Sequence, residues 1–300
     1  MLFVKIIIMN SKAIKHHYIP QFILRGFSND KEHVLCCDLE TGEAQIRKVN
    51  QIFFTRNLYK DERLDIPIEI ENELAKFESE VAPLFERIRK ANKSFSLTID
   101  EEDKLKLFIA ILGFRANRTR NYFKKELDDE NKDFYSKYLK DDETFEELWK
   151  RNLFEISKCR SFQDIKNSNT IDDVFKAFMA KDTIGLTGSY FIVCDKRGNE
   201  DFVLSDCFPM VHEGFLDSGI SLTLYLFIPL SPKRILIQAF FGCKNSPNSL
   251  SLIDKKILVY PSLNKNNFKY SVKKIYEEDI HRINEATIKN SSYGYIKGEN

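Results

Sequence analysis

The chain has 300 residues, of which 43% are hydrophobic and 30% charged, a composition typical of a globular protein with enough apolar side chains for a sizeable core. Its 46 basic and 45 acidic residues leave a net charge of +1, which argues against binding nucleic acid through overall charge alone. The six cysteines form no C-x-x-C pair, so we expect reduced thiols in a cytoplasmic protein and no cysteine-rich zinc site.

The first ten residues, MLFVKIIIMN, form an apolar run interrupted by Lys5. A run of this length is far too short to span a bilayer, and no small-residue cleavage site follows it. We therefore expect no membrane segment. Met9 is an alternative start, so we take the protein to be one intertwined domain over residues 9–300.

The next segment, KHHYIPQFILRGF at 15–27, combines two histidines with large apolar residues. In an extended segment, His16 and His17 face opposite ways and cannot both bind one metal ion. The apolar side chains and Pro20 suggest a segment that docks on a core. Two interpretations remain: one histidine is catalytic or metal-binding, or one histidine only pins a backbone group.

The elements that follow are predicted from periodicity. Residues 33–49 read as a β-hairpin that turns at Gly42, and residues 52–60 as a short aromatic strand or loop. An apolar stripe predicts a helix over 68–92, which Pro83 could kink. A second helix is expected over 98–127, capped by Thr98 or Asp100 and apolar on nearly every side, as in a central helix.

The rest of the chain adds further helices and then strands. Residues 128–158 and 171–181 have helical periods, strand-like runs begin at 189, and residues 272–296 are expected to close the chain as a helix. The order of strands, helices and strands predicts an α+β fold: an N-terminal β-hairpin segment, a central helical bundle, then mostly antiparallel strands and a closing helix.

Four further polar residues stand out as candidates. Glu71 and Glu78 are seven residues apart, so they share one side of the first long helix beside its apolar stripe. Arg118 projects from apolar surroundings and needs an anionic partner, for which Glu78 is the natural candidate; the alternative is a bound phosphate. Asp206 ends a strand before a turn, where an aspartate either stabilises the turn or serves as an active-site acid.

The chain lacks the glycine-rich phosphate loops of nucleotide-binding proteins, the serine-hydrolase elbow G-x-S-x-G and the zinc motif H-E-x-x-H. The pattern H-x-x-P-x-F-x-L-x-x-F, formed by His17, Pro20, Phe22, Leu24 and Phe27, resembles instead the N-terminal signature of a mainly bacterial family, domain of unknown function 4238. The resemblance continues through ETG (40–42), NLY (57–59), the helix from 71 to 83, Arg118–Thr119, FVLSD (202–206), PLSP (229–232) and INEA (283–286).

The family usually has Asp, one residue and then Pro after the strand, whereas Cys207 and Phe208 separate Asp206 from Pro209 in this chain. The resemblance implies no established reaction. Members are associated with bacterial anti-phage defence loci, which implies that a nucleic-acid-directed effector is one possible role.

Three hypotheses follow. In the first, the chain is a phosphodiesterase or nuclease-like effector whose catalytic residues converge, around a divalent metal such as Mg²⁺ or Mn²⁺; these residues are His17, Glu71, Glu78, Arg118 and Asp206. In the second, the same residues form a structural network in a non-catalytic binding or sensing module. In the third, a basic group binds nucleic acid directly; it comprises Arg115, Arg118, Arg120, Lys124 and Lys125.

Overall fold

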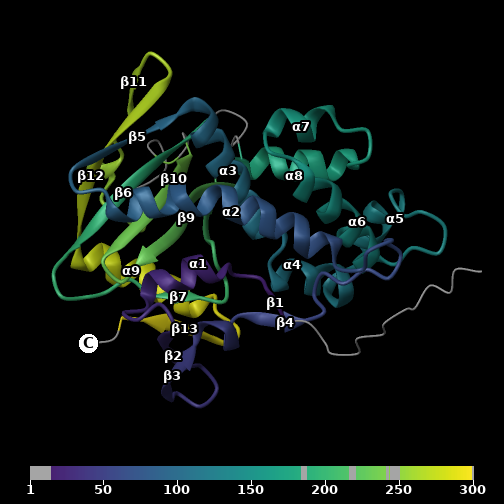
Figure 1. Cartoon of the computed structure of the whole chain (residues 1–300), viewed down its shortest axis with the longest axis horizontal. Coiled ribbons are helices and arrows are strands. Elements are labelled where there is room, and N and C mark those ends of the chain that lie inside the picture. The colour runs from purple at the N-terminus through teal and green to yellow at the C-terminus, as the bar shows by residue number, and fades with distance from the viewer. Residues whose placement is uncertain (1–14, 184–187, 216–220, 241–242, 244–250, 299–300) are drawn as a thin grey trace, which may run out of the picture.

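The computed structural model describes residues 15–183, 188–215, 221–240, 243 and 251–298. The apolar N-terminal run and the alternative start at Met9 lie outside these residues. Within them, no helix is both long enough and apolar enough to cross a membrane. The fold is α+β, as expected (Figure 1).

The helices of the described residues lie mostly in the first two thirds of the chain. They are α1 (Gln21–Leu24), α2 (Glu69–Lys90), α3 (Ile99–Phe114), α4 (Asn117–Asn121), α5 (Asp129–Ser136), α6 (Phe145–Lys158), α7 (Phe162–Asn167), α8 (Asp173–Thr183) and α9 (Glu277–Lys289), with short turns η1 (Arg25–Phe27), η2 (Val49–Gln51) and η6 (Lys255–Ile257) and a π-helical turn η3 (Tyr122–Glu126).

The strands form three sheets. A large sheet has the order β11 (Ser262–Asn264), β12 (Asn267–Tyr276), β6 (Ser189–Arg197), β10 (Arg234–Phe240), β9 (Ser221–Ser231), β8 (Met210–Phe215), with β5 (Ser94–Thr98) also paired to β12. A smaller sheet has the order β3 (Ala44–Lys48), β2 (His33–Asp38), β13 (Gly294–Lys297), β7 (Leu204–Ser205). A third pairs β1 (Lys15–His17) with β4 (Phe54–Arg56). All pairs are antiparallel except β12–β6.

The large sheet is covered on both faces. Along β6, Phe191 and Val193 face the main core, whereas Ile192 and Cys194 face a second core that includes Ile280 of α9. In Figure 1, α2 runs from the large sheet on the left toward the helices α5–α8 on the right, and the smaller sheet lies below. The alternation of side chains along the strand explains how one sheet can serve two cores.

Helix α2 forms as its apolar stripe predicts, and Pro83 lies inside it without interrupting it. Its C-terminal carbonyls are bound by a strand residue: Nη1 of Arg234 donates to the carbonyl oxygens of Ile88 (2.9 Å) and Arg89 (2.8 Å). The same guanidinium donates from Nε to Asp195 at 2.6 Å. A paired cation at the negative end of a helix is favourable, so this contact fixes α2 on the sheet.

The segment 15–27 docks against α2 and the sheet. The ring of Phe22 lies 5.3 Å from Phe85 and 6.0 Å from Phe108, measured between ring centroids. Arg89 donates from Nη2 to the carbonyl of Phe22 (3.3 Å) and from Nε to that of Leu230 (2.9 Å), joining α1 to β9. A Cβ at Gly26 would collide with the Leu230 carbonyl oxygen, so this approach requires glycine. The expected docking of this segment is therefore observed.

Helix α3 is shorter than predicted. It ends at Phe114, Ala116 has an extended backbone (φ −57°, ψ 147°), and α4 starts at Asn117. Two hydroxyl groups replace helical hydrogen bonds at this break: Thr119 Oγ1 donates to the carbonyl of Gly113 (2.8 Å), and Tyr59 donates to that of Arg115 (3.0 Å). The prediction of one helix over 98–127 is wrong because these hydroxyls satisfy carbonyls that would otherwise favour a continuous helix.

The expected closing helix over 272–296 is also only partly right. Residues up to Tyr276 belong to β12, α9 occupies Glu277–Lys289, and the chain returns as β13. Strand β13 pairs with β2, with Tyr295 opposite Cys37 and Ile296 opposite Cys36. Strands from the two ends of the described chain therefore share one sheet.

The start of α3 gives a direct stability test. Thr98 Oγ1 accepts from the backbone N–H of Glu101 (3.1 Å), and the Glu101 carboxylate accepts from the backbone N–H of Thr98 (2.9 Å). We predict that Thr98→Ala lowers the free energy of unfolding by about 1 kcal/mol in urea titrations. Thr98→Ser, which keeps the acceptor, is the control and is expected to match the unsubstituted protein. Equal loss in both variants would contradict this assignment.

Candidate functional site

His16 is held inside the protein by the polypeptide backbone. Its Nδ1 accepts a hydrogen bond from the backbone N–H of Tyr59 at 2.8 Å, and its ring stacks on the Tyr59 ring at 5.4 Å. Burial, together with the charges of His17 and Lys150, lowers the pKa of His16 to about 4, so the imidazole is neutral at physiological pH. His16 thus has the backbone-pinning role that the sequence left open for one of the two histidines.

His17 lies on the opposite side of β1, as the extended backbone requires. Its ring hydrogen-bonds to the backbone of Val49, a contact that raises the pKa and is therefore made by a ring N–H to the carbonyl. Burial outweighs this contact and, with Lys15, Arg115 and Arg25, lowers the pKa of His17 to about 4. The other ring nitrogen, Nε2, then carries the lone pair; it is buried and has no hydrogen-bond partner within the described residues.

Arg115 is the cation at the centre of the site. It follows the last residue of α3, is 1% exposed, and its Nη1 lies 2.7 Å from Oε1 of Glu78. We predicted that Arg118 would be the partner of Glu78; this was wrong, because the break at Ala116 redirects the chain before residue 118. The Nε and Nη2 groups of Arg115 are buried and lack partners within the part of the chain that the structure describes.

Glu71 and Glu78 both face this arginine from α2. Burial raises the pKa of Glu71 to about 7, and the charge of Glu78 acts in the same direction, whereas the charge of Arg115 lowers it. Glu71 is therefore close to half-protonated at neutral pH. The spacing of seven residues correctly predicted a shared helix side, and the raised pKa is the kind of perturbation found at functional sites.

A depression of about 250 Å³ lies near the site, but neither His17, Arg115 nor the two glutamates of α2 belong to its lining; it is connected to them through Phe54 and Asn117. Its walls include Phe54, which packs against the His17 ring at 5.9 Å, and Asn117, whose Oδ1 is buried without a described partner. Arg47 also lines it, and Nζ of Lys15 lies 4.5 Å from the Phe54 ring centroid. Tyr59 lies in the NLY segment of the family resemblance but was not singled out as a site residue, and neither a motif nor a spacing marks Asn117 or this depression.

Asp206 stabilises a turn. Its carboxylate accepts a hydrogen bond from the hydroxyl of Ser291 and from the backbone N–H groups of Ser292 (3.1 Å) and Tyr293 (3.2 Å). These bonds hold the loop between α9 and β13. Asp206 thus stabilises a turn, but one that is distant in the sequence rather than the expected turn before Pro209.

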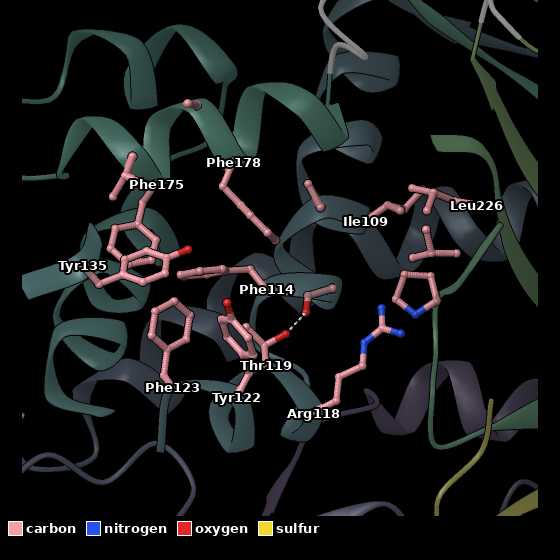
Figure 2. Close-up of a pocket in the computed structure, with 16 residues that line it drawn as sticks. Ile109, Phe114, Arg118, Thr119, Tyr122, Phe123, Tyr135, Phe175, Phe178 and Leu226 are labelled. Atoms are coloured by element: carbon pink, nitrogen blue, oxygen red, sulfur yellow. Dashed lines mark hydrogen bonds between the residues drawn. The ribbon is translucent and has the colours of Figure 1, made fainter. Parts of the chain in front are cut away.

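Arg118 lies away from Glu78, at the rim of a separate cavity (Figure 2). The structure thus brings His17, Glu71 and Glu78 around Arg115, while Arg118 lines a separate cavity and Asp206 binds the loop between α9 and β13. Of the basic group considered for nucleic acid, Arg120 and Lys124 both pair with Glu146, at 2.8 and 3.5 Å. No group of three or more His, Cys, Asp or Glu side chains in the described residues is arranged to hold a metal ion.

Comparison with known proteins gives one match. The model of a family described as a protein of unknown function, DUF4238, matches residues 15–298, nearly the whole chain. No curated protein and no solved structure matches.

Because the pKa of Glu71 is raised, the direction in which its contribution to stability changes with pH can be predicted. The folded protein keeps a proton on Glu71 that the unfolded chain releases, so this residue's contribution to stability declines as the pH rises from about 4.5 to about 7. We predict that Glu71→Gln becomes more stable relative to the unsubstituted protein across this range in urea titrations at pH 5, 6, 7 and 8. The exposed Glu126→Gln serves as the control, and a pH-independent difference for Glu71→Gln would refute the assignment.

The two histidines are expected to differ in their effect on folding. We predict that His16→Ala lowers the free energy of unfolding by about 3 kcal/mol, because it leaves the buried Tyr59 N–H without an acceptor and opens a cavity. His281→Ala, at a side chain 60% exposed, is the control and should change little. Chemical denaturation measures both. A loss below about 1 kcal/mol for His16→Ala would mean that Tyr59 is not held in this way.

Proposed function

Since the chain belongs to the DUF4238 family of proteins of unknown function, we propose a function from its geometry: it is an acid–base enzyme that cleaves a phosphodiester. The observation that carries the proposal is a group of buried polar atoms without described partners in neighbouring residues: Nε2 of His17, Nε and Nη2 of Arg115, and Oδ1 of Asn117. Buried polar groups in folded proteins are nearly always hydrogen-bonded. Several such atoms without a partner in neighbouring residues therefore favour a bound ligand that supplies the missing hydrogen bonds.

The charges around these atoms favour an anionic ligand. Lys15, Arg115 and Arg25 all act on His17 in the direction expected of nearby cations. Arg115 has two nitrogen donors, Nε and Nη2, to offer after its contact with Glu78, and a guanidinium binds the paired oxygens of a phosphate or carboxylate particularly well. Nε2 of the neutral His17 ring can accept a proton or hydrogen bond beside that anion.

The proton positions suit the cleavage of a P–O bond. Neutral His17 takes the proton of the attacking water or hydroxyl at Nε2, and protonated Glu71 gives its proton to the leaving oxygen. The reaction leaves His17 protonated and Glu71 ionised, and exchange with solvent restores both. A phosphodiester carries its negative charge on the reacting group itself, whereas esters and amides do not. The position of Arg115 beside both proton-transfer groups therefore favours a phosphodiester as the substrate class.

We also place this activity in the cytoplasm of a bacterial cell and, by family resemblance, in anti-phage defence. The presence of Cys36, Cys37, Cys159, Cys194 and Cys207 as thiols supports a reducing compartment.

The test is hydrolysis of bis(p-nitrophenyl) phosphate, plasmid DNA and RNA by the full chain, with Mg²⁺, with Mn²⁺ and with EDTA. We predict that His17→Gln lowers kcat/KM by at least about 100-fold, the usual range for a general base. His281→Gln, an exposed histidine, is the matched control. For the unsubstituted protein, kcat/KM should rise with pH near the His17 pKa of about 4 and fall near the Glu71 pKa of about 7.

A second function is favoured by a different observation. His16–Tyr59, Arg115–Glu78 and the contacts of Asp206 are structural bonds between separate parts of the chain. They support the alternative of a non-catalytic binding or sensing module. The assay separates the two: no hydrolysis on any substrate, together with a lowered melting temperature in both His17→Gln and Glu78→Gln, would favour the module and refute the enzyme.

A further inference from the structure

A larger cavity lies on the other side of the break at Ala116, outside the site proposed above. Its volume is about 580 Å³, within the range of small-molecule sites. It is walled by α3, α4, α8 and strands β8 and β9, through side chains such as Ile109, Phe114, Phe178 and Leu226 (Figure 2). Most of its lining is apolar, and aromatic rings are frequent in it.

Gly113 contributes to the open space. It belongs to α3, and a Cβ built on it would meet no atom within 4 Å apart from its own helix and chain neighbours. Glycine weakens a helix relative to alanine, so neither the helix nor a close contact explains this residue. The absent side chain leaves room in the cavity that Gly113 lines.

Few polar groups line the cavity, and they differ in whether they already have a hydrogen-bond partner in the protein. Thr119 already donates its hydroxyl to the Gly113 carbonyl at 2.8 Å. Arg118 is exposed, and its guanidinium makes no ion pair or hydrogen bond with any residue that the structure describes. In Figure 2 this guanidinium extends toward the end of the cavity near Leu226, while Phe123, Tyr135 and Phe175 gather at the opposite end. A ligand in this cavity would thus meet aromatic rings at one end and a cation at the other.

We propose that this cavity binds a small aromatic anion: a planar ring system that packs against Phe178, which is 38% exposed, and the half-buried Tyr122, with one carboxylate, sulfonate or phosphate group held by Arg118. Aromatic rings favour stacked and edge-to-face contacts with other rings, and a guanidinium binds such anions through paired hydrogen bonds. Nothing in the phosphodiesterase proposal depends on this site, because the two use different arginines.

The probe is 8-anilinonaphthalene-1-sulfonate, whose fluorescence reports binding, with the uncharged N-phenyl-1-naphthylamine as its matched partner. We expect one sulfonate probe per chain. Arg118→Gln should weaken binding of the sulfonate probe about tenfold, as expected for the loss of one charged hydrogen-bonding group. Binding of the neutral probe should not change. Lys125→Gln removes the same charge from an exposed residue outside the cavity and should alter neither. Gly113→Leu, which fills the cavity, should weaken the binding of both probes at least about tenfold.

Equal binding of the sulfonate probe by the Arg118→Gln and Lys125→Gln proteins would overturn the proposal, as would unchanged binding of both probes by Gly113→Leu. Circular dichroism and thermal melting verify that each variant is folded. If Gly113→Leu does not fold, Ala177→Phe replaces it, because Ala177 is an exposed lining residue whose enlargement also occupies the cavity. Unchanged binding of both probes by a folded Ala177→Phe protein counts equally against the proposal.

Discussion

The buried pairing of Arg115 with Glu78 is the contact on which the arrangement of the site depends. A guanidinium that is 1% exposed requires a carboxylate, and Glu78 of α2 supplies it at 2.7 Å. The pairing sets α2 against the end of α3. The Tyr59 hydroxyl binds the Arg115 carbonyl, and the Tyr59 backbone N–H binds His16, so the N-terminal segment is joined to the same place through Tyr59. Removing the Glu78 carboxylate would leave the Arg115 guanidinium buried and unpaired, a loss of about 3–5 kcal/mol in comparable cases.

Burial has opposite effects on the two proton-transfer candidates. It lowers the pKa of His17 to about 4 and raises that of Glu71 to about 7, because the charged form is disfavoured in both. Between these values the histidine can accept a proton while the glutamic acid still holds one. The same desolvated environment therefore leaves His17 able to accept a proton and Glu71 able to donate one. Neither residue needs an oppositely charged partner to reach that state.

Local sequence patterns predicted the parts of the fold that depend on neighbouring residues: the stripe of α2, the hairpin at Gly42, and the start of α3, for which Thr98 was one of two cap candidates. They failed where distant groups decide the outcome. The break after α3 depends on the Tyr59 hydroxyl, far away in sequence. On an uninterrupted helix Arg115 and Arg118 share a side, so periodicity alone could not tell which arginine meets Glu78. Glu71, Glu78 and His17 were expected to converge with Arg118, whereas in the structure the arginine beside them is Arg115. Asp206 could not be separated from turn residues.

The pairing of β13 with β2 has a consequence for biosynthesis. When β2 leaves the ribosome, β3 follows at once and protects one of its edges, but the strand that protects the other edge is translated only after nearly all of the intervening chain. Until then that edge exposes unpaired amide and carbonyl groups, which can capture a strand of another nascent molecule. Slow or stalled translation would prolong this exposure, so synthesis rate and chaperone supply should influence the yield of native protein.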